Sequence, residues 1–371
     1  MAEAKAVLGD VRPLQAGSVA IIESEHWDGA VLQDRLAGTV KLGDIIDERT
    51  PDVLDEKLLA DHIEARPRAD RILFGLTIVG GTSKQLKSLK NLPILLKREL
   101  QDRGKSVRWV TGDNGSLAPA AVSKLGLTTD GYDFVIAIHG ETASIGLTTH
   151  VQNIDAWSLR DFGRPFRDAK TGMLPPKLAR MMVNLAAPKN SLLDPFCGSG
   201  TVVMEAALLH DTLALVGSDI DARQIAGAKE NFEWLMSKEL LRRSDAERID
   251  WKISPAQELD KHLAGKTFDA IVTEGYLGKP LQGNEPQKHL DELAKEVETV
   301  WNKSLHVLAK LQPSGGRLVA IWPELTSSHG SSTVDASKAA KEVGYISSGK
   351  SIIYARPDQH IRRHIVTLVK E

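Results

Sequence analysis

The segment from Leu192 to Thr201 (LLDPFCGSGT) constrains the fold more than any other part of the chain. A short apolar run leads into a carboxylate, then a glycine-containing turn, then a helical pattern over Val202–Leu209. Glycine lets a backbone turn sharply and approach a ligand closely. In open α/β sheets, ligands bind at the carboxyl ends of the strands. The segment therefore predicts a ligand-binding loop at the end of a strand in an α/β sheet.

The composition of this loop narrows the class of ligand. Only Gly198 and Gly200 of a dinucleotide-type fingerprint are present, and the Gly-Lys-Ser/Thr of a phosphate loop is absent. Asp194 precedes the glycines, and a carboxylate there favours a ligand with a positively charged amino group, such as the methionine part of S-adenosylmethionine. The alternative is a tight turn without a ligand.

A second acid follows at the spacing expected for a sugar contact. Asp219 ends the next predicted strand, 19 residues after Gly200. An acid about 20 residues beyond such a loop accepts hydrogen bonds from ribose hydroxyls. Asp221 is better placed to cap the helix that begins at Ala222.

Strand and helix patterns alternate through this half of the chain and predict a parallel sheet covered on both faces. An antiparallel hairpin is expected to close it, as in Rossmann-like methyltransferases. The predicted strands are Leu192–Leu193, Leu213–Gly217, Trp251–Ser254, Phe268–Val272 and Arg317–Trp322, with Lys350–Ala355 and His364–Lys370 as the hairpin. The predicted helices are Val202–Leu209, Arg223–Lys238 and Lys288–Leu311.

The first 150 residues predict a smaller α/β region. Its expected strands are Ser18–Glu23, one that follows a turn within Leu36–Ile46, Arg71–Val79, Val107–Val110 and Tyr132–His139. Its expected helices are Asp52–Ala65, Lys84–Arg103 and Pro119–Leu125. At 371 residues, two or three domains are expected in all.

Composition excludes several classes of protein. No run of about 18 apolar residues predicts a membrane span, and the first ten residues do not resemble a secretory signal. The single Cys197 excludes an intrachain disulfide and a multi-cysteine zinc site. His360 and His364 lack a third ligand, so no metal is expected. A reducing cytoplasm is the expected location.

Positive charge is concentrated in two segments of a chain whose net charge is −2. One lies between Lys84 and Arg108 and the other between Arg160 and Arg180. Such clusters can follow a phosphate backbone, or can be solvated faces of ordinary helices. The candidate RNA-binding residues are Lys84, Lys87, Lys97, Arg98, Arg164, Arg167 and Lys170.

The segment after the Phe268–Val272 strand is the candidate catalytic loop, Thr273-Glu274-Gly275-Tyr276. Methylation of an exocyclic amine requires acceptors that orient the amine, because its lone pair is delocalised into the ring. Glu274 can accept such hydrogen bonds and Tyr276 can stack on a base. The alternative is a strand-end acid and a packing aromatic.

Two longer runs carry a resemblance to a known family: Asp155–Ala186, which includes RPFRDAK and MLPPKLA, and the adjoining LLDPFCGSGTVVMEAA. They resemble the THUMP-associated tRNA guanosine-N2 methyltransferases that modify the guanosine at position ten. The resemblance implies a methyltransferase domain over residues 153–371, a THUMP-like RNA-binding domain over 66–152, and an α/β region over 1–65 that begins late relative to the family. It implies S-adenosylmethionine as cofactor and tRNA as partner. The implied cofactor residues are Asp194, Phe196, Gly198, Ser199, Gly200, Thr201, Asp219, Ile220 and Pro175.

The catalytic loop departs from this family. The family carries Asp-Pro-Pro-Tyr where this chain has Thr273 to Tyr276, and Ser254-Pro255 replaces an acid that often contacts adenine. Three functions therefore stay open: a tRNA guanine-N2 methyltransferase, a DNA amino-methyltransferase, and a non-catalytic RNA-binding homologue. The sequence carries no signal for or against a small activating protein.

Overall fold

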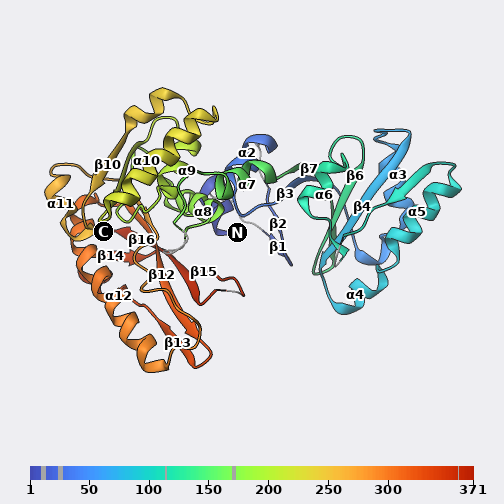
Figure 1. The fold of residues 1–371 in the computed structure, drawn as a ribbon. Coiled ribbons are helices and arrows are strands. Elements are labelled where there is room, and N and C mark those ends of the chain that lie inside the picture. Colours follow the sequence, from blue (N-terminus) through green and yellow to red (C-terminus); the bar gives the residue numbers. More distant parts are fainter. Residues whose placement is uncertain (10–13, 24–27, 113–114, 169–172, 358) are drawn as a thin grey trace. The chain divides into compact units, whose positions relative to one another are not determined.

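The computed structural model describes residues 1–9, 14–23, 28–112, 115–168, 173–357 and 359–371. The chain divides into two compact units, Met1–Ala156 and Trp157–Glu371, which are described separately below. Figure 1 labels their helices and strands.

The C-terminal unit is built on a sheet of nine described strands. Seven of them lie in the order β10-β9-β8-β11-β12-β16-β14. The first five are parallel, and β16 runs antiparallel to both of its neighbours. Their bounds are β8 Ser191–Asp194, β9 Ala214–Asp219, β10 Ile249–Ile253, β11 Ala270–Thr273, β12 Arg317–Ser327, β14 Tyr345–Ser347 and β16 Ile361–Lys370.

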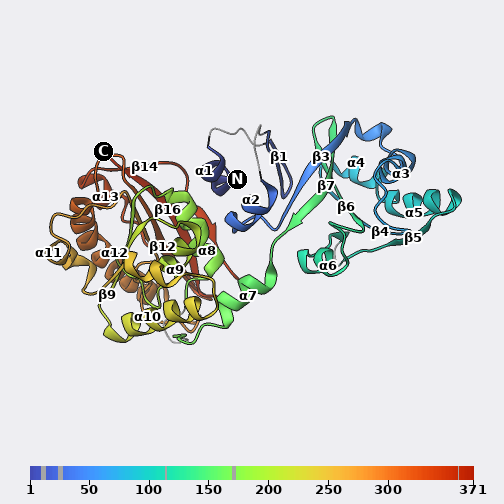
Figure 2. The ribbon, with the colours of Figure 1, turned by 90° about the horizontal axis from the view of Figure 1, so that it is seen from above.

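Helices cover both faces of this sheet, as Figure 2 shows. One face carries α8 (Pro176–Ala186), α9 (Thr201–Leu209) and α10 (Ala222–Ser237). The other carries α11 (Leu259–His262), α12 (Gln287–Leu308) and α13 (Ser337–Glu342). The core beneath α12 includes Leu193 and Ile271 of the sheet and the fully buried Trp301 of the helix. Such strands are apolar throughout because neither face meets water.

The structure confirms the predicted parallel sheet with its closing antiparallel strands. Two short strands were not predicted: β13 (Gly330–Thr333) pairs with β12, and β14 pairs with β16. The strand predicted over Lys350–Ala355 is β15 (Ile352–Tyr354), which also pairs with β16. The predicted hairpin is therefore β15 and β16, but β16 lies inside the sheet rather than at its edge.

The N-terminal unit contains a five-stranded sheet of order β3-β7-β6-β4-β5. These strands are β3 Lys41–Arg49, β4 Arg71–Gly80, β5 Ser106–Trp109, β6 Tyr132–His139 and β7 Thr142–Val151. Helices α3 (Glu56–Glu64) and α5 (Leu92–Asp102) bury Leu59, Leu96 and Leu100 against one face. The remaining elements are α1 Ala2–Leu8, β1 Leu14–Ala16, β2 Val19–Ile21, α2 Gly29–Arg35, α6 Pro119–Lys124 and α7 Ile154–Phe162, whose last six residues belong to the C-terminal unit. Because β3 belongs to this sheet and α3 to its core, the compact unit extends across the domain boundary that was predicted after residue 65.

The predicted single helix over Lys84–Arg103 is wrong in one respect. It is two helices, α4 (Ser83–Ser88) and α5, separated at Leu89–Asn91. Pro93 lies in the first turn of α5. In a continuous helix, its ring would clash with the carbonyl of Leu89, whereas a proline is tolerated in a first turn.

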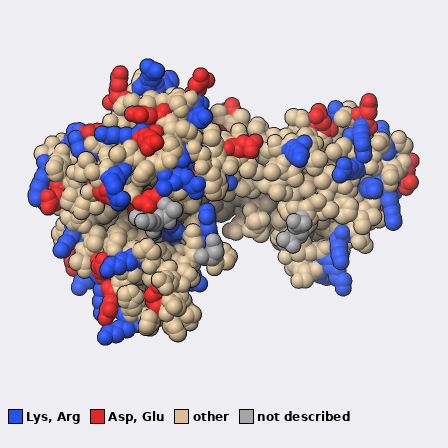
Figure 3. Space-filling view, viewed as in Figure 1, with Lys and Arg blue, Asp and Glu red and all other residues tan. Residues whose placement is uncertain are grey.

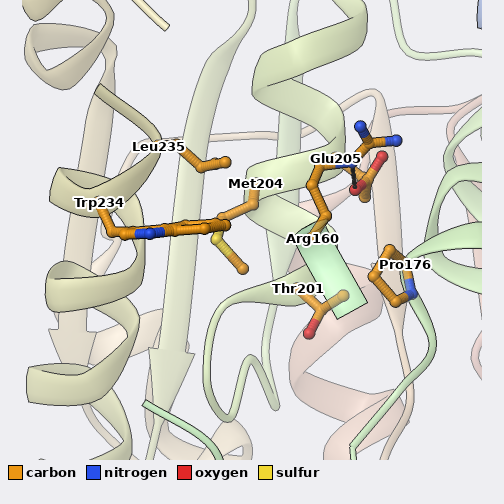
Figure 4. A pocket seen from close by; sticks show the side chains of 7 residues that line it. All are labelled: Arg160, Pro176, Thr201, Met204, Glu205, Trp234 and Leu235. Atoms are coloured by element: carbon orange, nitrogen blue, oxygen red, sulfur yellow. Dashed lines mark hydrogen bonds and ion pairs between the residues drawn. The ribbon is translucent and has the colours of Figure 1, made fainter. Parts of the chain in front are cut away.

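A buried ionic cluster joins α7, α8 and α9. Glu205 of α9 accepts hydrogen bonds from Arg160 Nε and Arg180 Nε, both at 2.8 Å. The two guanidinium groups stack on the Trp157 ring, at 4.2 and 4.9 Å from its centroid. Glu205, Arg160 and Thr201 line a cavity of about 10 Å³. Figure 4 shows these side chains. This volume is at the lower limit for one water molecule.

Replacing Glu205 with Gln should destabilise the C-terminal unit by about 3 kcal/mol, because two buried cations lose their shared carboxylate. The measurement is urea unfolding followed by tryptophan fluorescence, to which five of the seven tryptophans contribute from this unit. Glu230→Gln, at an exposed position on α10, is the matched control and should shift stability by less than about 0.5 kcal/mol. Equal stability of the two variants would show that the cluster contributes little.

Candidate active site

Three loops meet at the carboxyl ends of the adjacent strands β9, β8 and β11. The Thr273 hydroxyl at the end of β11 donates a hydrogen bond to Asp194 Oδ1 at the end of β8, at 2.7 Å. The Gly198 N–H donates to Asp219 Oδ2 at the end of β9, at 3.0 Å. Residues that the sequence singled out separately are therefore joined in one site.

The glycine loop has a left-handed backbone, which favours glycine, at two positions. Gly198 and Gly200 have φ values of 49° and 85°, in the left-handed region. A Cβ on Gly200 would also lie 3.0 Å from the Ala228 Cβ and 3.2 Å from the Trp251 ring. The Cys197 N–H donates to the Ser218 carbonyl at 2.8 Å, which holds the loop beside β9.

The segment around Phe166, before α8, is linked to the glycine loop through Asn231. Asn231 of α10 donates through Nδ2 to the Ser199 and Phe166 carbonyls, both at 3.0 Å, and accepts from the Phe166 N–H at 2.9 Å. The Phe166 ring fills the space beside Gly227, where a Cβ would meet it at 2.1 Å. Sequence analysis missed Asn231, because its partners are 32 and 65 residues away.

The structure corrects the prediction that Arg164 contacts RNA. Its residue surface is only 2% exposed, and Nη1 donates to the Thr201 hydroxyl at 2.7 Å, at the start of α9. Burial lowers the pKa of Arg164, with the neighbouring charges contributing less. Arg164 therefore supports the glycine loop, which is the cofactor-type loop of this site, and does not lie on the surface.

Buried negative charge is the main electrostatic feature of the site. Burial raises the pKa of Asp194 to about 7, opposed by the hydrogen bonds from Thr273 and Phe196 and increased by the charges of Asp219 and Glu274. Burial also raises the pKa of Asp219 and, far more strongly, that of the Cys197 thiol. Such a site favours a cationic ligand and argues against Cys197 as a nucleophile, because its thiolate is disfavoured.

In the candidate catalytic loop, each side chain has a defined partner. Glu274 Oε1 accepts a hydrogen bond from Arg363 Nε of β16 at 2.6 Å. The Tyr276 hydroxyl donates to Glu296 of α12 at 3.1 Å, which holds this half-buried ring against the helix. Sequence reasoning missed Arg363, which lies 89 residues from Glu274 and has no local signal.

The other predicted cofactor residues lie around the same edge. Phe196 packs its ring against Trp301, with centroids 5.8 Å apart, and Pro175 is the N-cap residue of α8. Ile220 follows Asp219 and is 71% exposed, so an apolar side chain stands open beside the candidate sugar contact. Ser199 is buried in the loop.

The predicted RNA-binding cations have different surroundings. Lys84, Lys87 and Arg98 are exposed on α4 and α5, while Lys97 is half-buried. Figure 3 shows lysine and arginine side chains along this part of the surface. Arg167 is exposed and lies over the Phe162 ring, whereas Lys170 falls outside the described residues.

Part of the charge in the first basic segment is neutralised by acids. Arg103 binds Asp61, Glu64 and Glu99, and Lys105 binds Glu64.

Among the residues that the structure describes, no cluster of three metal-ligating side chains occurs. No described helix is long and apolar enough to cross a membrane.

The fold and the site together define a class. The structure of TrmN from Thermus thermophilus aligns with 95% of this chain and 89% of its own, with a TM-score of 0.53 and 16% identity. This likeness establishes a Rossmann-like methyltransferase fold. The family model described as UPF0020, RMKL-like, methyltransferase domain matches residues 164–327. That segment, slightly less than half of the chain, is similar to the methyltransferase domain of this family, whose implied methyl donor is S-adenosylmethionine.

Three curated relatives each match about a third of the chain. A tRNA (guanine(10)-N2)-dimethyltransferase of Pyrococcus abyssi is 36% identical over 115 residues, which is 31% of this chain and 30% of the relative. The enzyme of the same name from Methanothermobacter thermautotrophicus is 42% identical over 126 residues, 31% of this chain and 36% of the relative. A bovine U6 snRNA (guanine-N(2))-methyltransferase is 27% identical over 129 residues, 34% of this chain and 24% of the relative. The matches span about a third or less of these relatives.

The raised pKa of Asp194 predicts a pH-dependent stability. Between about pH 4 and pH 7, the folded chain binds a proton here that the unfolded chain releases, so folding stability falls as pH rises through this window. Asp194→Asn removes this titration and can keep both accepted hydrogen bonds. Relative to the variant, the wild type should lose roughly 1 to 3 kcal/mol of unfolding free energy between pH 5 and pH 8.

The measurement is urea unfolding of both chains at several pH values. Asp211→Asn is the control, because the Asp211 side chain is 80% exposed. A constant difference between wild type and Asp194→Asn across this range would contradict the assignment of a raised pKa to Asp194.

Proposed function

We propose that this chain transfers a methyl group from S-adenosylmethionine to the exocyclic N2 of a guanosine in tRNA. The observation that carries the proposal is the convergence of Asp194, Asp219 and Glu274 at the carboxyl ends of three adjacent strands in a methyltransferase fold. Cytoplasmic location is part of the same proposal.

The residues present fit the proposed cofactor. Gly198 leaves open space beside the backbone, because a Cβ there would meet only Gln224 Oε1, at 3.9 Å. Asp219 keeps acceptor capacity for ribose hydroxyls beyond the two backbone hydrogen bonds from Gly198 and Asp221. The open side chain of Ile220 offers an apolar surface to the adenine, and buried Asp194 favours the positive methionine end. When bound, S-adenosylmethionine supplies an electrophilic methyl group.

Glu274 has the position and chemistry to hold the accepting amine. It follows Thr273 directly, and the Thr273 bond to Asp194 fixes the end of β11 beside the cofactor loop. Its Oε1 is occupied by Arg363, which leaves Oε2 to accept a hydrogen bond from the amine. Accepting such a bond orients the nitrogen lone pair and removes positive charge as the new bond forms.

The guanine and RNA parts of the proposal rest on the relatives and on the N-terminal unit. The relatives described above share one chemistry in their names, methylation of guanine N2 in RNA. We propose that the predicted THUMP-like RNA-binding domain, residues 66–152, forms one unit with β3 and α3. In this proposal Lys84, Lys87, Lys97 and Arg98 are its phosphate contacts. The tRNA named for the archaeal relatives is the first substrate to test.

A non-catalytic RNA-binding homologue is the second candidate. The observation in its favour is the altered loop, where Thr273 and Gly275 replace residues of the Asp-Pro-Pro-Tyr motif and Glu274 is engaged by Arg363. Incubation of unmodified tRNA with methyl-labelled S-adenosylmethionine, followed by nucleoside analysis, separates the two. Label in N2-methylguanosine supports the enzyme, and RNA binding without label supports the alternative.

Glu274→Gln should lower kcat for tRNA methylation at least about 100-fold, because an amide accepts less well than a carboxylate and cannot take a proton. Its affinity for S-adenosylmethionine, measured by calorimetry, should stay within about threefold. Asp219→Asn should show the opposite pattern, with weaker cofactor binding as the primary defect. Glu292→Gln, on the exposed side of α12, is the control. Unchanged turnover in Glu274→Gln would remove this residue from the mechanism.

A further inference from the structure

We propose that Arg363 and Glu274 together recognise the target base and select guanine over the other bases. This inference rests on the proposed function and names the residue that sets its base specificity. Guanine presents two adjacent N–H donors, on N1 and N2, beside the acceptor O6. A carboxylate is complementary to the two donors, and a guanidinium is complementary to O6.

The arrangement of the pair supports this reading. Arg363 Nε donates to Glu274 Oε1 at 2.6 Å, and Nη1 donates to Gln359 Oε1 at 3.0 Å. Among the described residues, Nη2 of Arg363 and Oε2 of Glu274 have no hydrogen-bond partner, and neither atom is fully buried. The two side chains are 8% and 14% exposed. The pair therefore keeps one donor and one acceptor that no described residue engages, on two side chains that are joined by a hydrogen bond and are not fully buried.

The fold places this pair at the correct edge of the sheet. Because β16 is antiparallel, its first residues lie at the edge where β11 ends. Arg363 is paired with Pro323 of β12, and it reaches across that strand to the residue after Thr273. Arg363 is 89 residues from Glu274 in the sequence, and the strand topology brings its guanidinium to the catalytic loop.

The loop between Glu274 and α12 is also held at its far end. The Ser328 N–H donates to the Gly283 carbonyl at 2.8 Å, and the His360 ring lies where a Cβ on Gly283 would be, 2.2 Å from its Cε1. The Ser327 hydroxyl donates to the Glu285 carbonyl at 2.8 Å. Both ends of the loop therefore contact the region around the start of β16, which fixes the orientation of the pair before a base binds.

The pair discriminates between bases by the pattern of donors and acceptors. Adenine presents an N6 donor where guanine has O6 and an N1 acceptor where guanine has a donor. Against adenine, the guanidinium would face a donor and the carboxylate would face a lone pair. Sites that satisfy buried polar groups with one substrate reject an analogue that leaves them unpaired by large factors.

The test removes one acceptor from the base and one donor from the protein. Substrate tRNA is assembled with guanosine or 6-thioguanosine at the methylated position, because sulfur at C6 accepts hydrogen bonds poorly while the N1 and N2 donors remain. The wild type should prefer guanosine by at least tenfold in kcat/KM. Arg363→Gln should lower kcat/KM on guanosine about 100-fold and lose the preference, as a double-mutant cycle requires for a direct contact.

Two further variants separate recognition from folding. Arg363→Lys keeps a charge for Glu274 but loses the planar fork, so the fold should persist while the preference falls. Arg362→Gln changes the adjacent, more exposed arginine, whose side chain is 54% exposed, and should keep both rate and preference within twofold. Thermal unfolding of each variant shows which ones are folded.

A binding measurement gives an answer that does not depend on turnover. NMR titration of the S-adenosylhomocysteine complex with guanosine, 6-thioguanosine and adenosine should rank guanosine first, and Arg363→Lys should reduce that ranking. A preference for guanosine over 6-thioguanosine that survives in folded Arg363→Lys and Arg363→Gln would overturn the inference alone. Equal binding of all three nucleosides by the wild type would also overturn it. Absence of methylation with a clear, Arg363-dependent preference would instead overturn only the proposed enzyme activity.

Discussion

The hydrogen bond from Thr273 to Asp194 is the contact on which the site depends. It joins the ends of two adjacent parallel strands and therefore fixes the cofactor-type loop relative to the catalytic loop. Its acceptor is a buried carboxylate whose pKa burial raises to about 7. A hydroxyl partner satisfies this carboxylate without supplying a compensating positive charge, so the site keeps its preference for a cationic ligand.

Charge in the site is distributed unevenly, and the distribution suits the proposed chemistry. Asp194 and Asp219 have raised pKa values because they are buried and lie near other acids. Glu274, the third acid, is the one that receives a guanidinium. A carboxylate paired in this way is held in one orientation, which suits a group that must accept hydrogen bonds from an amine. Two unpaired acids then face the proposed sulfonium cofactor, and one paired acid faces the proposed base.

The linker before α8 is a structural part of the C-terminal unit. Arg164 binds Thr201, Phe166 packs beside Gly227, and Arg160 shares Glu205 with Arg180. These contacts hold three of the six cations between Arg160 and Arg180 inside the unit, where they bind the Glu205 carboxylate, the Thr201 hydroxyl and the Trp157 ring. The proposed phosphate contacts consequently fall mainly on α4 and α5.

The sequence by itself determined the parallel sheet, its closing hairpin and most of the residues along its carboxyl edge. These features are encoded locally: apolar runs of strand length, glycines at turns, and acids at strand ends, as in the segment from Leu192 to Thr201. The apolar spacing predicted one helix and missed the break between α4 and α5, because Pro93, and not the apolar pattern, causes that break. It also assigned Arg164 to the surface, since a charged residue near other cations gives no sign of burial. Only the tertiary structure decided that Thr273 would meet Asp194 and that Arg363 would meet Glu274. Those pairs are 79 and 89 residues apart, and they form because parallel strands end at one edge while β16 returns to the same edge in the opposite direction.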